Sequence, residues 1–178
     1  LRDQAPLSIE VCRNYTLPKY ADQNTLVFAV SYSGNTEETL RAFVDAIRRG
    51  CMVIAITSGG HLLSLSKKLR IPYLKIPGGM PPRAAIPYLF FPLPVLMKKM
   101  GLPLEIEEEI TETVEILQKL RKETAPQTVT DNNPPKKLAL DLADTIPIVY
   151  GFGPYGAVAH RWKTQFNENS KVPSYWEV

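Results

Sequence analysis

Cysteine, histidine and long apolar runs are scarce in this sequence of 178 residues. The two cysteines, Cys12 and Cys51, lie in or beside predicted strands, where buried free thiols are favoured over a disulfide. The two histidines have no neighbouring ligands at metal-binding spacing, so we predict no metal site. The longest apolar stretch, residues 86–97, is interrupted by three prolines and is too short to cross a bilayer.

An excess of charge of one sign is also missing. The sequence has 21 basic and 18 acidic side chains, a formal net charge of +3, and the two signs are interspersed. This balance provides no basic stripe for a nucleic acid, and no signal peptide is present, so we expect a cytoplasmic protein that binds neither nucleic acid nor membrane. Because the sequence starts at Leu1 and ends within an apolar run, 175–178, we expect a piece of a longer protein.

Apolar runs of strand length alternate with segments of helical periodicity. This alternation predicts an α/β fold with a parallel sheet flanked by helices, because parallel strands need crossover connections. We expect strands at 7–11, 26–30, 52–56, 72–77 and 146–151, and helices at about 36–49, 62–69, 83–100 (one helix or a pair), 105–122, 138–143 and 156–169. A polar, turn-rich stretch predicts a first domain at 1–122, a linker at 123–135 and the start of a second domain at 136–178.

The turn between the first fully apolar strand and the next helix reads SYSGNT. Asn35 and Glu38 form a predicted capping pair for this helix. The first amides of a helix lack internal partners, and its macrodipole places about half a positive charge there, so anions bind at such an end. An ordinary cap needs one hydroxyl, whereas Ser31, Ser33 and Thr36 together suit a phosphate with several acceptor oxygens. We predict a phosphate site, with a plain cap as the alternative.

Two charged residues lie at helix ends whose dipoles they oppose. Arg83 follows two prolines at a helix start, where a cation costs about 0.3–1 kcal/mol unless a bound phosphate compensates it. Glu168 lies near the end of the helix predicted at 156–169, flanked by amides in FNENSK. A carboxylate that amides orient without neutralising is suited to proton transfer. The alternatives are an exposed arginine and a surface glutamate.

Three glycines form a GxGxxG pattern between a predicted strand and a predicted helix: Gly151, Gly153 and Gly156. Glu177 lies about where a ribose-binding acid would be expected, so a dinucleotide site is a rival hypothesis. Pro154 within the loop weakens it, and it leaves the hydroxyl cluster unexplained. The glycines also suit close packing of a helix on a strand.

With these residues placed, the chain resembles the sugar isomerase (SIS) domain family, and within it the bifunctional phosphoglucose/phosphomannose isomerases. The matching blocks occur in the family's order over most of the chain, as SYSGNTEETL (31–40), ITSGG (56–60), PPRAAIPYL (81–89) and RWKTQFNENSK (161–171). The first block alone indicates a phosphosugar-binding SIS unit. The third and fourth blocks narrow the resemblance to the isomerase.

The resemblance implies a role for each candidate residue. Ser31, Ser33 and Thr36 match the family's phosphate-binding hydroxyls. Arg83 matches the arginine that stabilises the charged intermediate, and Glu168 matches the base that moves a proton between C1 and C2. The reaction implied interconverts glucose 6-phosphate or mannose 6-phosphate with fructose 6-phosphate through an enediolate, as in glycolysis and gluconeogenesis, without a metal or an organic cofactor.

The resemblance also implies a homodimer of tandem SIS units with sites at the subunit interface. Two family features lie outside these 178 residues: a glycine-rich phosphate loop upstream of the first strand, and a ring-opening histidine after the FNENSK block. A non-catalytic phosphosugar-binding SIS module is therefore our second hypothesis, and dinucleotide binding is the third. An assay of fructose 6-phosphate formation separates the first two, and thermal stabilisation by NAD tests the third.

Overall fold

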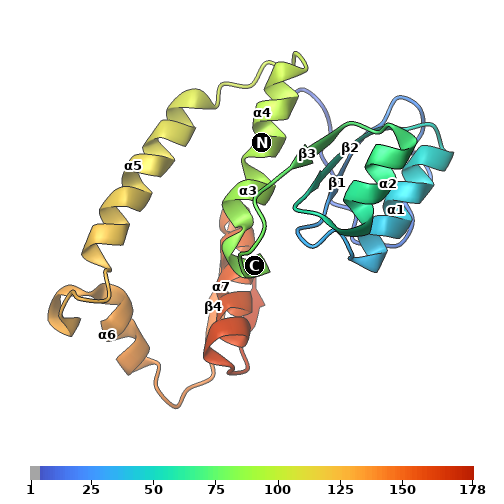
Figure 1. Ribbon diagram of the computed structural model, residues 1–178. Coiled ribbons are helices and arrows are strands. Elements are labelled where there is room, and N and C mark those ends of the chain that lie inside the picture. Colours follow the sequence, from blue (N-terminus) through green and yellow to red (C-terminus); the bar gives the residue numbers. More distant parts are fainter. Residues whose placement is uncertain (1–4) are drawn as a thin grey trace. The chain divides into compact units, whose positions relative to one another are not determined.

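The computed structural model of the chain describes residues 5–178. The chain divides into two compact units, of which the first ends at Ile106 and the second spans Glu107–Val178 (Figure 1). Each unit contains a small parallel sheet accompanied by helices, so the predicted α/β class is confirmed. The predicted domain boundaries stay predictions, since compact units need not coincide with family domains, and residues 1–4 of the predicted first domain lie outside the described part.

The sheet of the first unit consists of three parallel strands in the order β1-β2-β3, with β1 at Leu26–Val30, β2 at Met52–Thr57 and β3 at Tyr73–Lys75. The three strands that the apolar runs predicted here are thus present. Val30 pairs with Ile56, which places the carboxyl ends of β1 and β2 at one edge of the sheet. The loops that follow these two strands therefore leave the sheet side by side.

Two helices pack against this sheet, α1 at Glu37–Arg48 and α2 at Gly60–Leu69 (Figure 1). They bury Phe43 and Leu62 completely, and each such side chain contributes about 1.5–3 kcal/mol through the removal of apolar area from water. The buried cluster of the first unit comprises Leu17, Ala21, Ala29, Phe43, Ala46, Val53, Ala55 and Leu62. This core fixes both helices relative to the strand ends.

The strand predicted at residues 7–11 is wrong. These residues form no strand, and Leu7 and Val11 are 61% and 74% exposed. The following segment docks on α1 instead, because the Leu17 amide donates to the Asp45 carboxylate at 2.9 Å and the Arg49 guanidinium donates to a loop carbonyl. Within residues 5–178 the alternating pattern has no neighbouring strand to pair with. For the same reason Cys12 is exposed and not buried as predicted, whereas Cys51 is half-buried; both are free thiols.

The rest of the first unit is a 3-10 turn, η1 (Pro82–Ala84), followed by two short helices, α3 (Ile86–Phe90) and α4 (Pro92–Lys99). The region predicted as one helix or a pair is thus a pair. The break falls at Phe91, before a proline that cannot donate a helical hydrogen bond. Met97 and Ala85 are buried, so both ends of this region are held by apolar contacts.

The second unit has a two-stranded parallel sheet, formed by β4 and β5. Its elements are α5 (Glu107–Glu123), η2 (Thr130–Asn132), α6 (Pro134–Asp141), β4 (Ile148–Tyr150), η3 (Gly153–Tyr155), α7 (Gly156–Gln165), the π-helical turn η4 (Phe166–Ser170) and β5 (Tyr175–Glu177). The last strand was not predicted. Among residues 5–178, no helix is long and apolar enough to cross a membrane.

Candidate functional site

The loop that follows β1 is held in shape by its own hydroxyl groups. Ser31 is buried, and its amide donates to the Ile56 carbonyl at 3.1 Å, extending the β1–β2 pairing by one residue. Its Oγ accepts a hydrogen bond from the Gly34 amide at 3.1 Å and lies 2.9 Å from Thr36 Oγ1. The loop therefore folds back on Ser31, which brings the two ends of SYSGNT together.

The other two hydroxyls of the predicted site face solvent at the start of α1. Ser33 and Thr36 are exposed, and Ser33 Oγ accepts the Asn35 amide at 3.2 Å, which leaves its own hydrogen available to a ligand. Thr36 is the N-cap of α1, and within residues 5–178 its side chain makes no capping hydrogen bond. The first amides of α1 are thus directed toward the same place as the hydroxyls, an arrangement that favours an anion.

The loops after β1 and β2 interlock through glycines. Gly34 adopts a φ of +70°, and a Cβ built on it would lie 1.9 Å from the Gly59 carbonyl oxygen. Gly60 adopts a φ of +68°, and its Cβ would lie 2.3 Å from the Ser33 carbonyl oxygen. The Gly34 carbonyl in turn accepts the Leu62 amide at 2.9 Å. Only glycine fits this close approach, so the ITSGG block shapes the SYSGNT loop.

Asn35 does not form the predicted capping pair with Glu38. The N-cap of α1 is Thr36, and Asn35 Oδ1 accepts the amide of His61 at 3.0 Å, so Asn35 caps α2 from the neighbouring loop. Glu38 accepts a hydrogen bond from the Tyr15 hydroxyl at 3.3 Å, and its negative charge raises the pKa of that tyrosine. The sequence spacing predicted that Asn35 caps α1, whereas its tertiary contact caps α2.

Two further polar residues at the end of β2 support the loop, and the sequence patterns gave no signal for their role. Thr57 is fully buried, and its Oγ1 accepts the Gly59 amide at 3.2 Å. The Ser58 amide donates to the Tyr32 carbonyl at 3.0 Å, and the Ser58 hydroxyl donates to the same oxygen at 2.6 Å. The loops after β1 and β2 are therefore joined by hydrogen bonds at the Tyr32 carbonyl.

Arg83 belongs to the same unit as the hydroxyl cluster. It lies in η1 and is exposed, where the Ala84 amide donates to the Pro81 carbonyl at 2.9 Å. Ala85, immediately after this turn, is completely buried and anchors it. The predicted placement of the arginine in a first helical turn after two prolines thus corresponds to a short 3-10 turn.

Glu168 belongs to the second unit. It is exposed in the π-helical turn η4, where the chain leaves α7 and reaches Lys171, which adopts a φ of +58°. The side-chain amide of Asn167 donates to the Val172 carbonyl at 2.9 Å, which ties the turn to the segment that follows it. Such π-helical turns are frequent at functional sites. The structure brings Ser31, Ser33 and Thr36 together, and the participation of Arg83 and Glu168 in one site with them stays a prediction.

The GxGxxG glycines have a packing explanation. A Cβ on Gly151 would lie 2.3 Å from the Tyr155 carbonyl oxygen, so this glycine lets the chain turn tightly after β4. Gly156 begins α7, and its Cβ would lie 3.1 Å from a methyl group of Val178. The first approach holds the turn between β4 and α7, and the second holds the start of α7 against the residue after β5. No nucleotide is needed to account for the glycines at these two positions.

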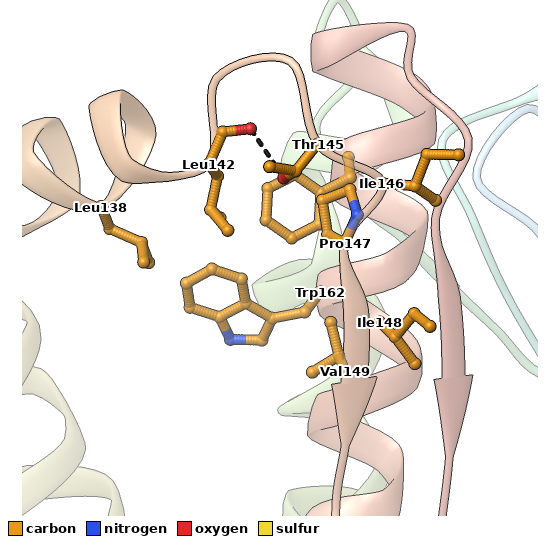
Figure 2. Close-up of a pocket in the computed structure, with 9 residues that line it drawn as sticks. Leu138, Leu142, Thr145, Ile146, Pro147, Ile148, Val149 and Trp162 are labelled. Carbon is orange, nitrogen blue, oxygen red and sulfur yellow. Dashed lines mark hydrogen bonds between the residues drawn. The ribbon is translucent and has the colours of Figure 1, made fainter.

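The second unit also contains an apolar hollow of about 540 Å³ (Figure 2). Its lining residues are Leu138, Leu142, Thr145, Ile146, Pro147, Ile148, Val149, Trp162 and Phe166. The Thr145 hydroxyl donates to the Leu142 carbonyl at 2.8 Å, so the one hydroxyl in the lining is already engaged. With no charged side chain among these lining residues, the hollow lacks partners for a phosphate. Within the described residues, no group of three His, Cys, Asp or Glu side chains could hold a metal ion.

Solved structures identify the class of fold. The chain superposes on a protein from Salmonella typhimurium described as a phosphosugar isomerase with a TM-score of 0.58, over 90% of this chain and 49% of that one. The two share 19% sequence identity, so this likeness establishes the fold alone. The fold is that of the SIS proteins, as the resemblance predicted.

Sequence comparison gives the nearer relationship. Residues 131–178 match the family described as the bacterial phospho-glucose isomerase C-terminal SIS domain. The chain is 45% identical over 177 residues to a bifunctional phosphoglucose/phosphomannose isomerase of Caldicellulosiruptor bescii, with 99% of this chain and 52% of the relative covered. It is 44% identical over 167 residues to the protein of the same name from Thermoplasma acidophilum, with 93% and 48% covered. The predicted relationship to SIS sugar isomerases is confirmed, and the chain spans about half the length of the curated relatives it matches.

Proposed function

We propose that the protein is an aldose–ketose isomerase that interconverts glucose 6-phosphate, and mannose 6-phosphate, with fructose 6-phosphate through an enediolate. The observation that carries this proposal is the cluster of three hydroxyls at the start of α1, held by an interlocked second loop. The relatives named as bifunctional phosphoglucose/phosphomannose isomerases, at up to 45% identity, support the same conclusion.

The sugar's phosphate binds to the loop after β1 in this proposal. The exposed Ser33 and Thr36 hydroxyls donate to phosphate oxygens, together with the first amides of α1. Ser31 is too buried to reach far into solvent. It contributes through Thr36, because a Ser31 hydroxyl that accepts from Gly34 and donates to Thr36 leaves the threonine hydrogen for the ligand.

The chemical step needs a base and a stabilising cation, and the proposal assigns these roles to Glu168 and Arg83. The Glu168 carboxylate removes the proton from C2 of the open-chain aldose, the C–H electrons form the C1–C2 double bond, and the C1 oxygen becomes anionic. The C2 hydroxyl then passes its proton to the C1 oxygen, and the same group returns the carbon-bound proton to C1 while the C2 oxygen becomes a carbonyl, which gives the ketose. Arg83 stabilises the enediolate, whose charge is absent from the substrate carbonyl, so the interaction favours the transition state over the ground state. The step uses no metal and no organic cofactor.

The assembly and compartment follow the same resemblance. We propose a homodimer in the cytoplasm, with 1–122 as a first SIS domain, 123–135 as a linker and 136–178 as the start of a second. The start of the matched family at residue 131 supports the position of the last division. Apolar side chains on α5 that are 45–53% exposed support an assembly that covers them, namely Val114, Ile116, Leu117 and Leu120.

Replacement of the base tests the proposal directly. Glu168→Gln in the full-length protein keeps the shape of the side chain but removes the proton acceptor, so isomerisation should fall by about 10²-fold or more while sugar-phosphate binding stays nearly intact. A coupled assay of fructose 6-phosphate consumption and calorimetric titration with the same sugar measure the two properties. Glu177→Gln, on β5 of the same unit, is the matched control and should retain full activity.

Three outcomes distinguish the hypotheses. Normal turnover by Glu168→Gln would refute the assigned base. Tight sugar-phosphate binding without turnover in the wild-type protein would favour the non-catalytic SIS module. Thermal stabilisation by NAD that Glu177→Gln abolishes would favour the dinucleotide hypothesis.

A further inference from the structure

Tyr32 connects three segments of the first unit. Its carbonyl oxygen accepts both the amide and the hydroxyl of Ser58, which fixes the main chain between Ser31 and Ser33 against the loop after β2. Its side chain extends to a third segment, where its hydroxyl oxygen accepts the Met80 amide at 2.9 Å. A single residue of the proposed phosphate loop is therefore bonded to two other loops.

The third segment is the one that carries Arg83. It leaves the sheet after Ile76, which is buried and donates its amide to the Thr57 carbonyl at 2.9 Å. Gly78 and Gly79 follow, and Gly79 adopts a φ of +86° with open space around it. This pair of glycines gives the backbone freedom to swing.

Beyond the glycines the segment becomes stiff. Pro81 and Pro82 follow Met80 directly, and their rings restrict φ at two consecutive positions. The turn η1 begins at Pro82, so Arg83 follows Met80 with little intervening freedom. The hydrogen bond from the Met80 amide to Tyr32 is placed where the flexible part ends and the stiff part begins. It therefore sets the position from which the arginine extends.

We propose that Tyr32 is a positioning residue, which holds Arg83 at a fixed separation from the phosphate loop. The inference rests on the proposed function, in which Arg83 stabilises the negative charge of the enediolate intermediate. A hexose 6-phosphate carries its phosphate at one end and its reacting carbons at the other, so the two groups that contact it must match its length. Catalysis depends steeply on such placement, because a misplacement of about 1 Å can cost 10²-fold in rate.

Tyr32→Phe is the test, because it removes one oxygen atom and keeps the ring. In the full-length protein we expect kcat for fructose 6-phosphate to fall about fivefold or more, while KM changes less than about twofold because Ser33 and Thr36 are untouched. Hydrogen–deuterium exchange at the Met80 amide should accelerate. Tyr73→Phe is the control, since this tyrosine lies on β3 and is 43% exposed; it should leave kcat and the Met80 exchange rate unchanged.

The outcomes separate this inference from the function on which it rests. A wild-type protein that converts no hexose phosphate would overturn both. An active wild type with an equally active Tyr32→Phe variant would overturn the inference alone. Unchanged exchange at the Met80 amide would also overturn the inference, because it would mean that the Tyr32 hydroxyl does not hold that amide. A lower melting temperature without any change in kcat would overturn it as well, because Tyr32 would then have only a structural role.

Discussion

At the scale of single residues, Ser33 offers a direct test of phosphate binding by the loop after β1. Its hydroxyl is exposed, and its oxygen already accepts the Asn35 amide, so its hydrogen is free to be donated to an anion. Ser33→Ala should weaken fructose 6-phosphate binding by about 1.5–3 kcal/mol, the usual value of a hydrogen bond to a charged group. Isothermal titration measures this directly, as a rise in Kd of tenfold or more.

Ser64→Ala is the matched control for that change. Ser64 is also exposed, lies on α2 and donates to a backbone carbonyl of its own helix at 3.1 Å. Its removal should leave the Kd within about twofold, since the residue has no place in the proposed site. An equal loss of affinity in both variants would argue that the first change acts through general instability and not through a lost contact.

The residue types of the site could be predicted from sequence, but their contacts could not. Three hydroxyls after a buried strand indicated an anion site because strand–turn–helix geometry is local. The roles of Asn35 and Tyr32 were missed because each bonds a residue far away in the chain, His61 and Met80 respectively. Spacing rules describe neighbours on one helix and give no information on such partners.

At the scale of elements, the interlock of the loops after β1 and β2 predicts that two glycine substitutions lower the unfolding free energy by different amounts. Gly34 and Gly79 both have positive φ, but a Cβ on Gly34 would collide with the Gly59 carbonyl while one on Gly79 meets open space. Gly79→Ala should cost about 1–2 kcal/mol of unfolding free energy through backbone strain alone. Gly34→Ala should cost clearly more, about 3 kcal/mol or above, because the β2 loop must also move. Urea denaturation of the two variants measures the difference, and equal costs would refute the interlock.

Strand prediction succeeded where the predicted strand pairs with a neighbouring strand and failed where it does not. The fully apolar runs that became β1 and β2 were recognisable because strands buried in a parallel sheet lose their polar alternation. Residues 7–11 alternate as a half-buried strand would, but in the described part of the chain they have no partner strand, and Leu7 and Val11 stay exposed. The π-helical turn at Glu168 could not be predicted either, since the sequence continues a helical pattern through it.

At the scale of the whole molecule, the two compact units should respond separately to a change in one of them. Asp45 in the first unit accepts the Leu17 amide and pairs with Arg49 at 2.9 Å, with both side chains less than one-third exposed. These partners, the Leu17 amide foremost, lower the pKa of Asp45. Asp45→Asn should therefore destabilise the first unit by about 1 kcal/mol at neutral pH.

The pH dependence of this loss follows from the direction of the shift. A carboxylate with a lowered pKa in the folded state stabilises it above the unfolded value of about 3.9, and this contribution disappears as the pH falls through the folded pKa. The difference between Asp45→Asn and wild type should thus shrink below about pH 4. Thermal melts followed by far-UV circular dichroism across this range provide the measurement.

The tryptophans give an internal control for the same experiment. Both of them, Trp162 and Trp176, lie in the second unit. If the units unfold independently, Asp45→Asn should lower the first-unit transition seen by circular dichroism and leave the tryptophan fluorescence transition unchanged. A common shift in both signals would mean that the two units unfold as one.

The overall class was predictable because the alternation of strand and helix constrains topology. The grouping of α5 with the second unit was not, since an amphipathic helix shows which face is apolar without showing what that face packs against. The proposed base and the proposed phosphate hydroxyls lie in different compact units. Their participation in one site stays a prediction, because local periodicity does not encode tertiary arrangement.

The close contacts of Gly34 and Gly60 also bear on how such a protein can change over generations. A side chain on Gly34 would need the space of the Gly59 carbonyl, and a side chain on Gly60 would need that of the Ser33 carbonyl, so neither loop is free to drift alone. A lineage that enlarged either glycine would have to remodel the opposite loop in concert, so the two glycines should be inherited together even while the surrounding surface diverges.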